Sequence, residues 1–135
     1  MPTLASVPVF ARVVRTAGNL TTTSTTLVDV TGSSVTFTTG AFPVQYAAAV
    51  ALRNDLGNNV RLNVDVDGTL LHGTTGITLF ADTSGNQFSG SFSGQTAELT
   101  AASHTIKLQW SVNATTGTLD ANTGSNHMWS AFEIR

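Results

Sequence analysis

The chain contains no cysteine and very little charge, and these two shortages narrow the kinds of protein it can be. Without cysteine, disulfide bonds and thiolate chemistry are excluded, although a chain of 135 residues can close a core without such staples. Only 10% of the residues are charged, compared with roughly 25% in an average soluble protein. Thr, Ser, Asn and Gly must therefore supply most of the polar surface.

Clusters of basic residues are also missing. The six Lys and Arg residues are scattered among eight acidic ones, which leaves a net charge of −2. A protein that binds nucleic acid has to neutralise phosphates, so we expect no nucleic-acid partner. The opening MPTLASVPVF lacks the basic start and the long apolar run of a signal peptide or membrane span. We therefore expect synthesis in the cytoplasm and no membrane partner.

The chain is rich in Thr and other β-branched residues. These residues favour strands, because their side chains fit a pleated surface better than a helix. From His104 to Val112, apolar and polar side chains alternate, which predicts a half-buried strand. Similar patterns between turn signals predict strands over 9–14, 27–30, 35–39, 44–52, 60–66, 69–71, 77–80, 87–92 and 128–134. We predict an all-β antiparallel two-sheet sandwich over residues 9–135.

An extended arm over residues 1–8 precedes the predicted sandwich. Two prolines interrupt this segment, so it is expected to be extended rather than helical. Two interpretations stay open. The arm is either a frayed terminus or a segment that docks on a neighbouring subunit, since Leu4 and Val7 are unfavourable in water.

No segment carries a recognisable catalytic motif. Residues 63–68 resemble the start of a calcium loop, but its twelfth position is Thr74 instead of Glu, so a polar strand face with a hairpin turn is favoured. Phe92 stands where the nucleophile of a GxSxG elbow would lie. His104 begins its strand in the inward phase, which favours a hydrogen-bonded histidine over a metal ligand. We expect no metal, no cofactor and no enzymatic activity.

Four large side chains are the predicted subunit-interface residues: Tyr46, Met128, Trp129 and Phe132. In the last strand, Met128 and Phe132 share one face while Trp129 lies on the other. Large aromatic residues are enriched at interfaces, which favours a subunit contact. A platform that stacks on sugar rings is the alternative. The pattern does not decide which of the two faces is turned toward the core.

Several segments, taken in order, resemble a known family. They are the alanine-rich strand at 44–52, VDG at 66–68, ELTAASHTIKLQWSV at 98–112, TGTLDA at 116–121 and the terminal FEI at 132–134. In this order they resemble the small jelly-roll domains of bacteriophage virion proteins, which are similar to the globular heads of complement and tumour-necrosis-factor proteins. The resemblance runs from about residue 10 to residue 134. It departs at Ala101 and Ala102, where many relatives have a glycine.

This resemblance implies a jelly roll of two Greek-key sheets, assembled as a homotrimer about a three-fold axis, without catalysis. Proteins of this kind lie on virion surfaces as capsid decoration proteins or as tail-fibre and tail-tip modules. About eight residues precede the first predicted strand, whereas fibre heads follow a long shaft. We therefore expect a capsid decoration protein on the virion surface that contacts the major capsid protein, with Leu4 and Val7 in a capsid-docking arm. The alternative is a tail-fibre or tail-tip module that binds a receptor or a host glycan.

Overall fold

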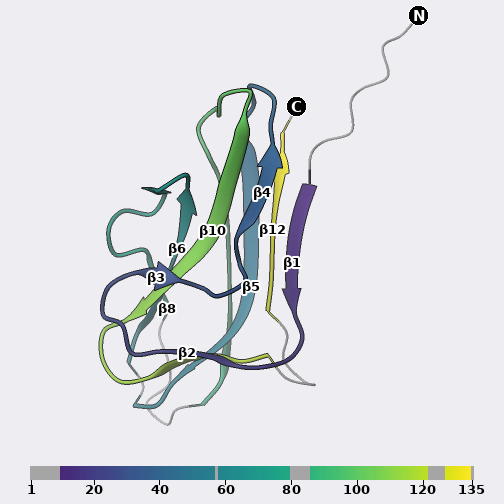
Figure 1. Cartoon of the computed structure of the whole chain (residues 1–135). Coiled ribbons are helices and arrows are strands. Elements are labelled where there is room, and N and C mark those ends of the chain that lie inside the picture. Colours follow the sequence, from purple (N-terminus) through teal and green to yellow (C-terminus); the bar gives the residue numbers. More distant parts are fainter. Residues whose placement is uncertain (1–9, 57, 80–85, 122–126, 135) are drawn as a thin grey trace, which may run out of the picture.

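The computed structural model describes residues 10–56, 58–79, 86–121 and 127–134, which form two layers of strands (Figure 1). Within these ranges the backbone forms twelve strands and no helix. The predicted all-β architecture with two antiparallel sheets is therefore confirmed. Among the same residues, no helix is long and apolar enough to cross a membrane. The predicted arm at 1–8, with Leu4 and Val7, lies outside the described residues.

One layer, sheet A, is built around a long central strand, β5. Its six strands are β1 (Phe10–Arg15), β2 (Leu20–Thr22), β5 (Val44–Asn54), β9 (Phe88–Gln95), β11 (Gly117–Leu119) and β12 (His127–Glu133). β9 pairs along one edge of β5, while β12 and then β11 pair along the other. β1 extends the sheet beyond β12, and β2 extends it beyond β11.

The other layer, sheet B, is built around β10 and β6. Its strands are β3 (Val28–Asp29), β4 (Val35–Thr38), β6 (Val60–Val66), β7 (Thr69–Leu70), β8 (Ile77–Leu79) and β10 (Ser103–Val112). β10 pairs with β6 on one side and with β4 and β3 on the other. Asp67 and Gly68 connect β6 to β7 with φ of 51° and 87°, which confirms the predicted hairpin turn.

The core lies between the two sheets, where every second residue of the long strands points inward. Ile106, Leu108 and Trp110 of β10 are each at most 3% exposed, as the alternation from 104 to 112 predicted. Leu62 and Val64 of β6 are fully buried beside them. Packing of these side chains against the inner face of sheet A supplies the apolar burial that stabilises the fold.

The short strand β11 was not predicted. Three residues are too few to show an alternating pattern, and the strand begins at Gly117. A Cβ on Gly117 would lie 2.5 Å from Cγ1 of Val112, so only glycine lets β11 lie this close to the end of β10. β5 also extends two residues beyond its predicted end at Leu52, because β11 pairs with that extension.

Candidate functional site

The face of sheet A that points away from sheet B, called here the outer face of sheet A, carries a patch of small side chains. Ala49 of β5 lies opposite Met128 of β12 and Ser91 of β9. One step along, Ala47 lies opposite Ser130 and Ser93. Directly paired residues point to the same side of a sheet, so these small side chains form one continuous patch.

A hollow of about 360 Å³ lies over this patch. Its described lining residues are small or apolar and include no charged side chain: Ala47, Ala48, Ala49, Ser91, Phe92, Ser93, Met128 and Ser130. At one end of the hollow, Met128 is 40% exposed, and its neighbour Val14 of β1 is 42% exposed. Large apolar side chains therefore project beside a floor of alanine, where another surface can approach the backbone closely.

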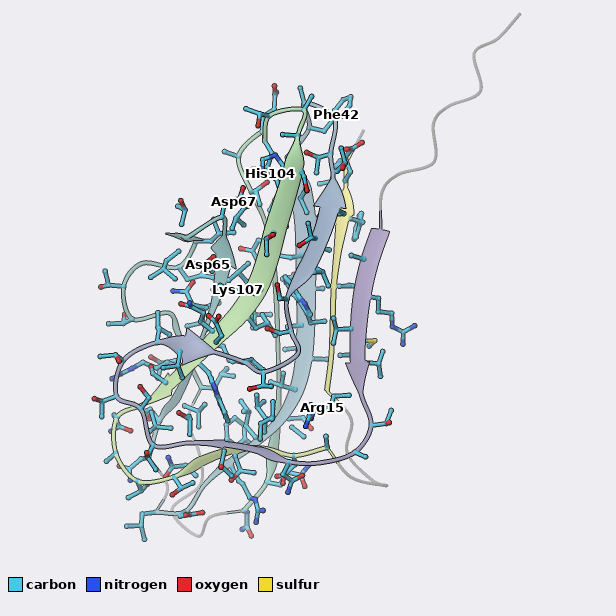
Figure 2. All side chains as sticks on the ribbon, viewed as in Figure 1. Arg15, Phe42, Asp65, Asp67, His104 and Lys107 are labelled. Carbon is cyan, nitrogen blue, oxygen red and sulfur yellow. The ribbon has the colours of Figure 1, made fainter. Side chains whose placement is uncertain are left out.

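The outer face of sheet B carries a carboxylate that is held by two neighbouring side chains. Lys107 of β10 donates a hydrogen bond from Nζ to Oδ2 of Asp29 at 2.8 Å, and Gln109 donates from Nε2 to Oδ1 of the same carboxylate at 2.8 Å. The hydrogen bond from Lys107, and to a smaller extent that from Gln109, holds the pKa of Asp29 below its ordinary value. Figure 2 shows Lys107 beside the green strand β10. The outer face of sheet B thus carries an ion pair, whereas the lining of the hollow on sheet A contains no charged side chain.

Two of the four predicted interface residues lie in the core instead. Tyr46 is 2% exposed and Trp129 is 1% exposed. Trp129 lies opposite Ala48, whose small side chain leaves room on the inner face, and its Nε1 donates to the carbonyl oxygen of Ser33 at 2.7 Å. The interface prediction for Tyr46 and Trp129 is therefore corrected, and the buried indole of Trp129 is not a sugar-stacking platform.

The other two predicted residues lie on the outer face of sheet A. Met128 is exposed beside the hollow and Phe132, two positions from Ser130, is half-buried on the same side. Strand β12 therefore turns its Trp129 face toward the core and its Met128 face outward. The alternation in the sequence had not decided between these two orientations. A role of Met128 and Phe132 in a subunit interface stays a prediction.

A second cluster closes one open edge of the sandwich. The hydroxyl of Tyr46 lies 2.9 Å from Nε2 of His72, and both rings contact Phe92 of β9 edge to face. The side chain of Asn63 fixes the position of His72. The backbone N–H of His72 donates to Oδ1 of Asn63 at 3.0 Å, and Nδ2 of Asn63 donates to the carbonyl oxygen of Gly73 at 2.7 Å. Burial lowers the pKa of His72 and raises the pKa of Tyr46, so both groups are held neutral.

At one end of the molecule, His104 and Asp67 lie in contact (Figure 2). His104 Nδ1 is 2.6 Å from Oδ2 of Asp67, and the backbone N–H of Thr105 donates to Oδ1 at 2.8 Å. Asp65 accepts the N–H of Gly68 at 2.9 Å. The hydrogen-bonded role predicted for His104 is confirmed, and both carboxylates of the calcium-like segment accept protein donors. No group of three or more His, Asp or Glu residues in the described ranges is arranged to hold a metal.

The sequence pattern did not reveal the hollow, because its residues come from three strands that are distant in sequence. The signal that was present is the alternation within β5, where Ala47 and Ala49 are the residues between buried positions. No protein-family model matches this chain, and no curated protein matches it.

Proposed function

We propose that this chain is a non-enzymatic structural protein of a bacteriophage virion, a homotrimer that decorates the capsid surface. The observation that supports it best is the uncharged hollow on the outer face of sheet A, bordered by exposed Met128 and Val14. Cores of protein interfaces are depleted of charge and enriched in Met and aromatic residues, and the lining of the hollow contains Met128 and Phe92 and no charged side chain. The charged outer face of sheet B instead suits contact with water.

The order of the strands supports a jelly roll, the finer fold within the two-sheet sandwich. The order runs β1-β12-β5-β9 in sheet A and β4-β10-β6 in sheet B, with β7 and β8 beyond β6. The connections from β4 to β5, β5 to β6, β8 to β9 and β9 to β10 each pass from one sheet to the other. Such an order is expected when two Greek keys wrap around one core. Jelly rolls occur in viral capsid and lectin domains alike, so the fold favours a capsid role by analogy alone.

A second copy of the chain is the proposed occupant of the hollow. Ala47 and Ala49 allow its backbone to come close, and burial of Met128 and Val14 favours association because both are large and apolar. The number of copies, three, comes from the resemblance to trimeric jelly-roll heads. In that arrangement the segment with Leu4 and Val7, together with the loops, contacts the major capsid protein at a three-fold position and holds neighbouring capsid subunits together.

Light scattering on the purified chain tests the assembly. A trimer has a mass of about 42 kDa, three times the 14.1 kDa of one chain. A mass of one chain at micromolar concentration contradicts the proposal. Electron cryomicroscopy of the parent particle tests the location: density at three-fold positions of the shell supports a decoration protein, and density confined to the tail contradicts it.

The tail-fibre or tail-tip alternative is favoured by one observation, the exposed ring of Phe42. This side chain is 39% exposed at the same end of the sandwich as His104 (Figure 2). Exposed aromatic rings stack on sugars, so a host glycan would bind here. Glycan binding that is lost in Phe42→Ala and kept in Val28→Ala, which shortens another exposed apolar residue, would favour this alternative.

A further inference from the structure

Both ring nitrogens of His104 face hydrogen-bond acceptors. Nδ1 lies 2.6 Å from Oδ2 of Asp67, and Nε2 lies 2.9 Å from the carbonyl oxygen of Thr100. A carboxylate and a carbonyl have no proton to donate, so each nitrogen must carry one. This arrangement fits the doubly protonated, positively charged imidazolium form, and the ring is 8% exposed.

The Thr100 carbonyl connects His104 to the end of the molecule that we call the tip, residues 39–43 and 96–102. The same carbonyl accepts a hydrogen bond from Oγ1 of Thr39 at 3.0 Å. Two backbone bonds join the segments: Thr39 N–H donates to the Ala102 carbonyl at 2.9 Å, and Leu99 N–H donates to the Phe42 carbonyl at 3.2 Å. His104 therefore contacts the point where the two tip segments meet.

We propose that His104 is a proton-dependent latch, which in its protonated form bridges Asp67 to the Thr100 carbonyl and on losing a proton releases the tip. A neutral imidazole carries one proton, and Nδ1 keeps it because the bond to a carboxylate is the stronger one. Nε2 then presents a lone pair to the carbonyl of Thr100. Two lone pairs that face each other at 2.9 Å repel, and this repulsion is relieved when the Thr100 segment moves away from the ring.

The hairpin side of the latch does not open with it. Asp67 is still held by the N–H of Thr105, and its own N–H donates to the Thr105 carbonyl at 3.0 Å. Deprotonation is therefore expected to loosen the tip while the β6–β7 turn stays in place. All of these bonds lie within one chain, so the latch operates in a monomer and in a trimer alike.

Asp67 is the charged partner of the ring. The hydrogen bond between Asp67 and His104 makes the largest contribution to raising the pKa of His104. The bond to the Thr100 carbonyl raises it further, while burial of the ring lowers it. On β4, the residue paired with His104 is Phe37, flanked by two threonines, and Lys107 of β10 pairs with Asp29 on the outer face. Glu98 lies in the tip, and among the described residues its carboxylate makes no ion pair with the ring.

The direction of the pH response follows from these contacts. Because the folded pKa of His104 is raised above the ordinary value of about 6.5, its contribution is complete below that value and is lost as pH rises through the folded pKa. The pKa of Asp67 is lowered, chiefly by the bond to His104, so its contribution is lost as pH falls through the folded value. The latch is therefore closed at mildly acidic pH and opens as pH rises through the raised pKa of His104, and when closed it holds the tip that carries exposed Phe42.

A nuclear magnetic resonance titration of the wild-type chain tests the latch without any substitution. Two-bond nitrogen–proton correlations are expected to show both ring nitrogens of His104 protonated near pH 6, with a pKa above 6.5. Hydrogen-exchange protection of the Leu99 amide should then fall roughly tenfold or more as pH passes that pKa, the change expected when a hydrogen bond to a charged group is lost. Protection of the Val30 amide, which donates to Leu108, should stay constant. A neutral ring at pH 6, or unchanged Leu99 protection, would overturn the proposal.

Two asparagine variants separate the latch from general charge effects. Asp67→Asn is expected to lower the pKa of His104 and to move the loss of Leu99 protection to lower pH. Asp29→Asn removes a carboxylate that pairs with Lys107 on the outer face of sheet B. It should leave unchanged the pKa of His104 and the pH at which Leu99 protection is lost. An unchanged His104 pKa in Asp67→Asn contradicts the proposal, and if that variant does not fold, the wild-type titration decides.

Discussion

Replacing Gly94 with alanine is expected to destabilise the protein, because the ring of Tyr46 already fills the space beside this glycine. The two residues lie directly opposite each other on β9 and β5. A Cβ on Gly94 would overlap the Tyr46 hydroxyl and lie 2.6 Å from its Cζ. The ring cannot easily move aside, because its hydroxyl is hydrogen-bonded to His72 and its edge contacts Phe92.

The expected magnitude is the difference between two effects. Overpacking a core by one methyl group costs about 1–3 kcal/mol. Alanine also restricts the unfolded chain relative to glycine, which stabilises by about 0.4–1 kcal/mol where the backbone conformation allows it. The net destabilisation of Gly94→Ala therefore lies between about 0 and 2.6 kcal/mol, with a middle value of about 1.3 kcal/mol. Gly90, four residues earlier, is the matched control, since a Cβ there meets only the flexible end of Leu79 at 3.0 Å.

Urea denaturation of the two variants and the wild type at one protein concentration provides the assay, because stability depends on concentration in an oligomer. Gly94→Ala should have a lower midpoint with an unchanged slope, and Gly90→Ala should lie within about 0.5 kcal/mol of the wild type. Adding Tyr46→Phe to Gly94→Ala removes the overlapping hydroxyl and should recover part of the loss. If Gly94→Ala is as stable as Gly90→Ala, the packing argument is refuted.

Three further predictions concern the core and the titratable groups. Trp129→Phe removes the donor to the Ser33 carbonyl and should destabilise by about 1–3 kcal/mol in denaturant unfolding, whereas an unchanged midpoint would place the indole outside the core. Burial lowers the folded pKa of His72, so its contribution to stability is present above about pH 6.5 and is lost as pH falls through the folded value. The pH dependence of thermal unfolding below that value should therefore be weaker in His72→Gln, and an identical dependence in both proteins would contradict the assignment. A chelator should leave the thermal midpoint unchanged, because Asp65 and Asp67 accept protein N–H groups; a lower midpoint would reveal a bound metal.

The parts of the fold that the sequence predicted are those in which one periodic pattern dominates. β10 and β6 alternate cleanly, and Asp67-Gly68 has the backbone chemistry of a tight hairpin turn. The last strand was ambiguous because both of its faces are apolar, so periodicity could not turn Trp129 inward. Its burial depends on Ala48, which lies opposite it on a strand some eighty residues earlier.

The candidate interface was less predictable than the strands. The hollow forms because β9 and β12 pair with the two edges of β5, and long-range pairing of this kind leaves no local pattern. Tyr46 was selected as an interface residue for its size, but Gly94 makes space for its ring inside the sandwich. Size and aromatic character alone therefore do not distinguish a core residue from a surface residue.

The measurement that tests the proposed trimer most directly is the mass by light scattering of two variants at equal micromolar concentration. Ala49→Glu places a charge in the floor of the hollow, and Thr38→Glu places the same charge at an exposed position on the outer face of sheet B. The account predicts a trimer for the wild type and Thr38→Glu, and a folded monomer for Ala49→Glu, because a buried unpaired charge opposes association. A trimer that persists in Ala49→Glu would contradict the assignment of the interface to sheet A, and its dissociation in Thr38→Glu alone would place the interface on sheet B.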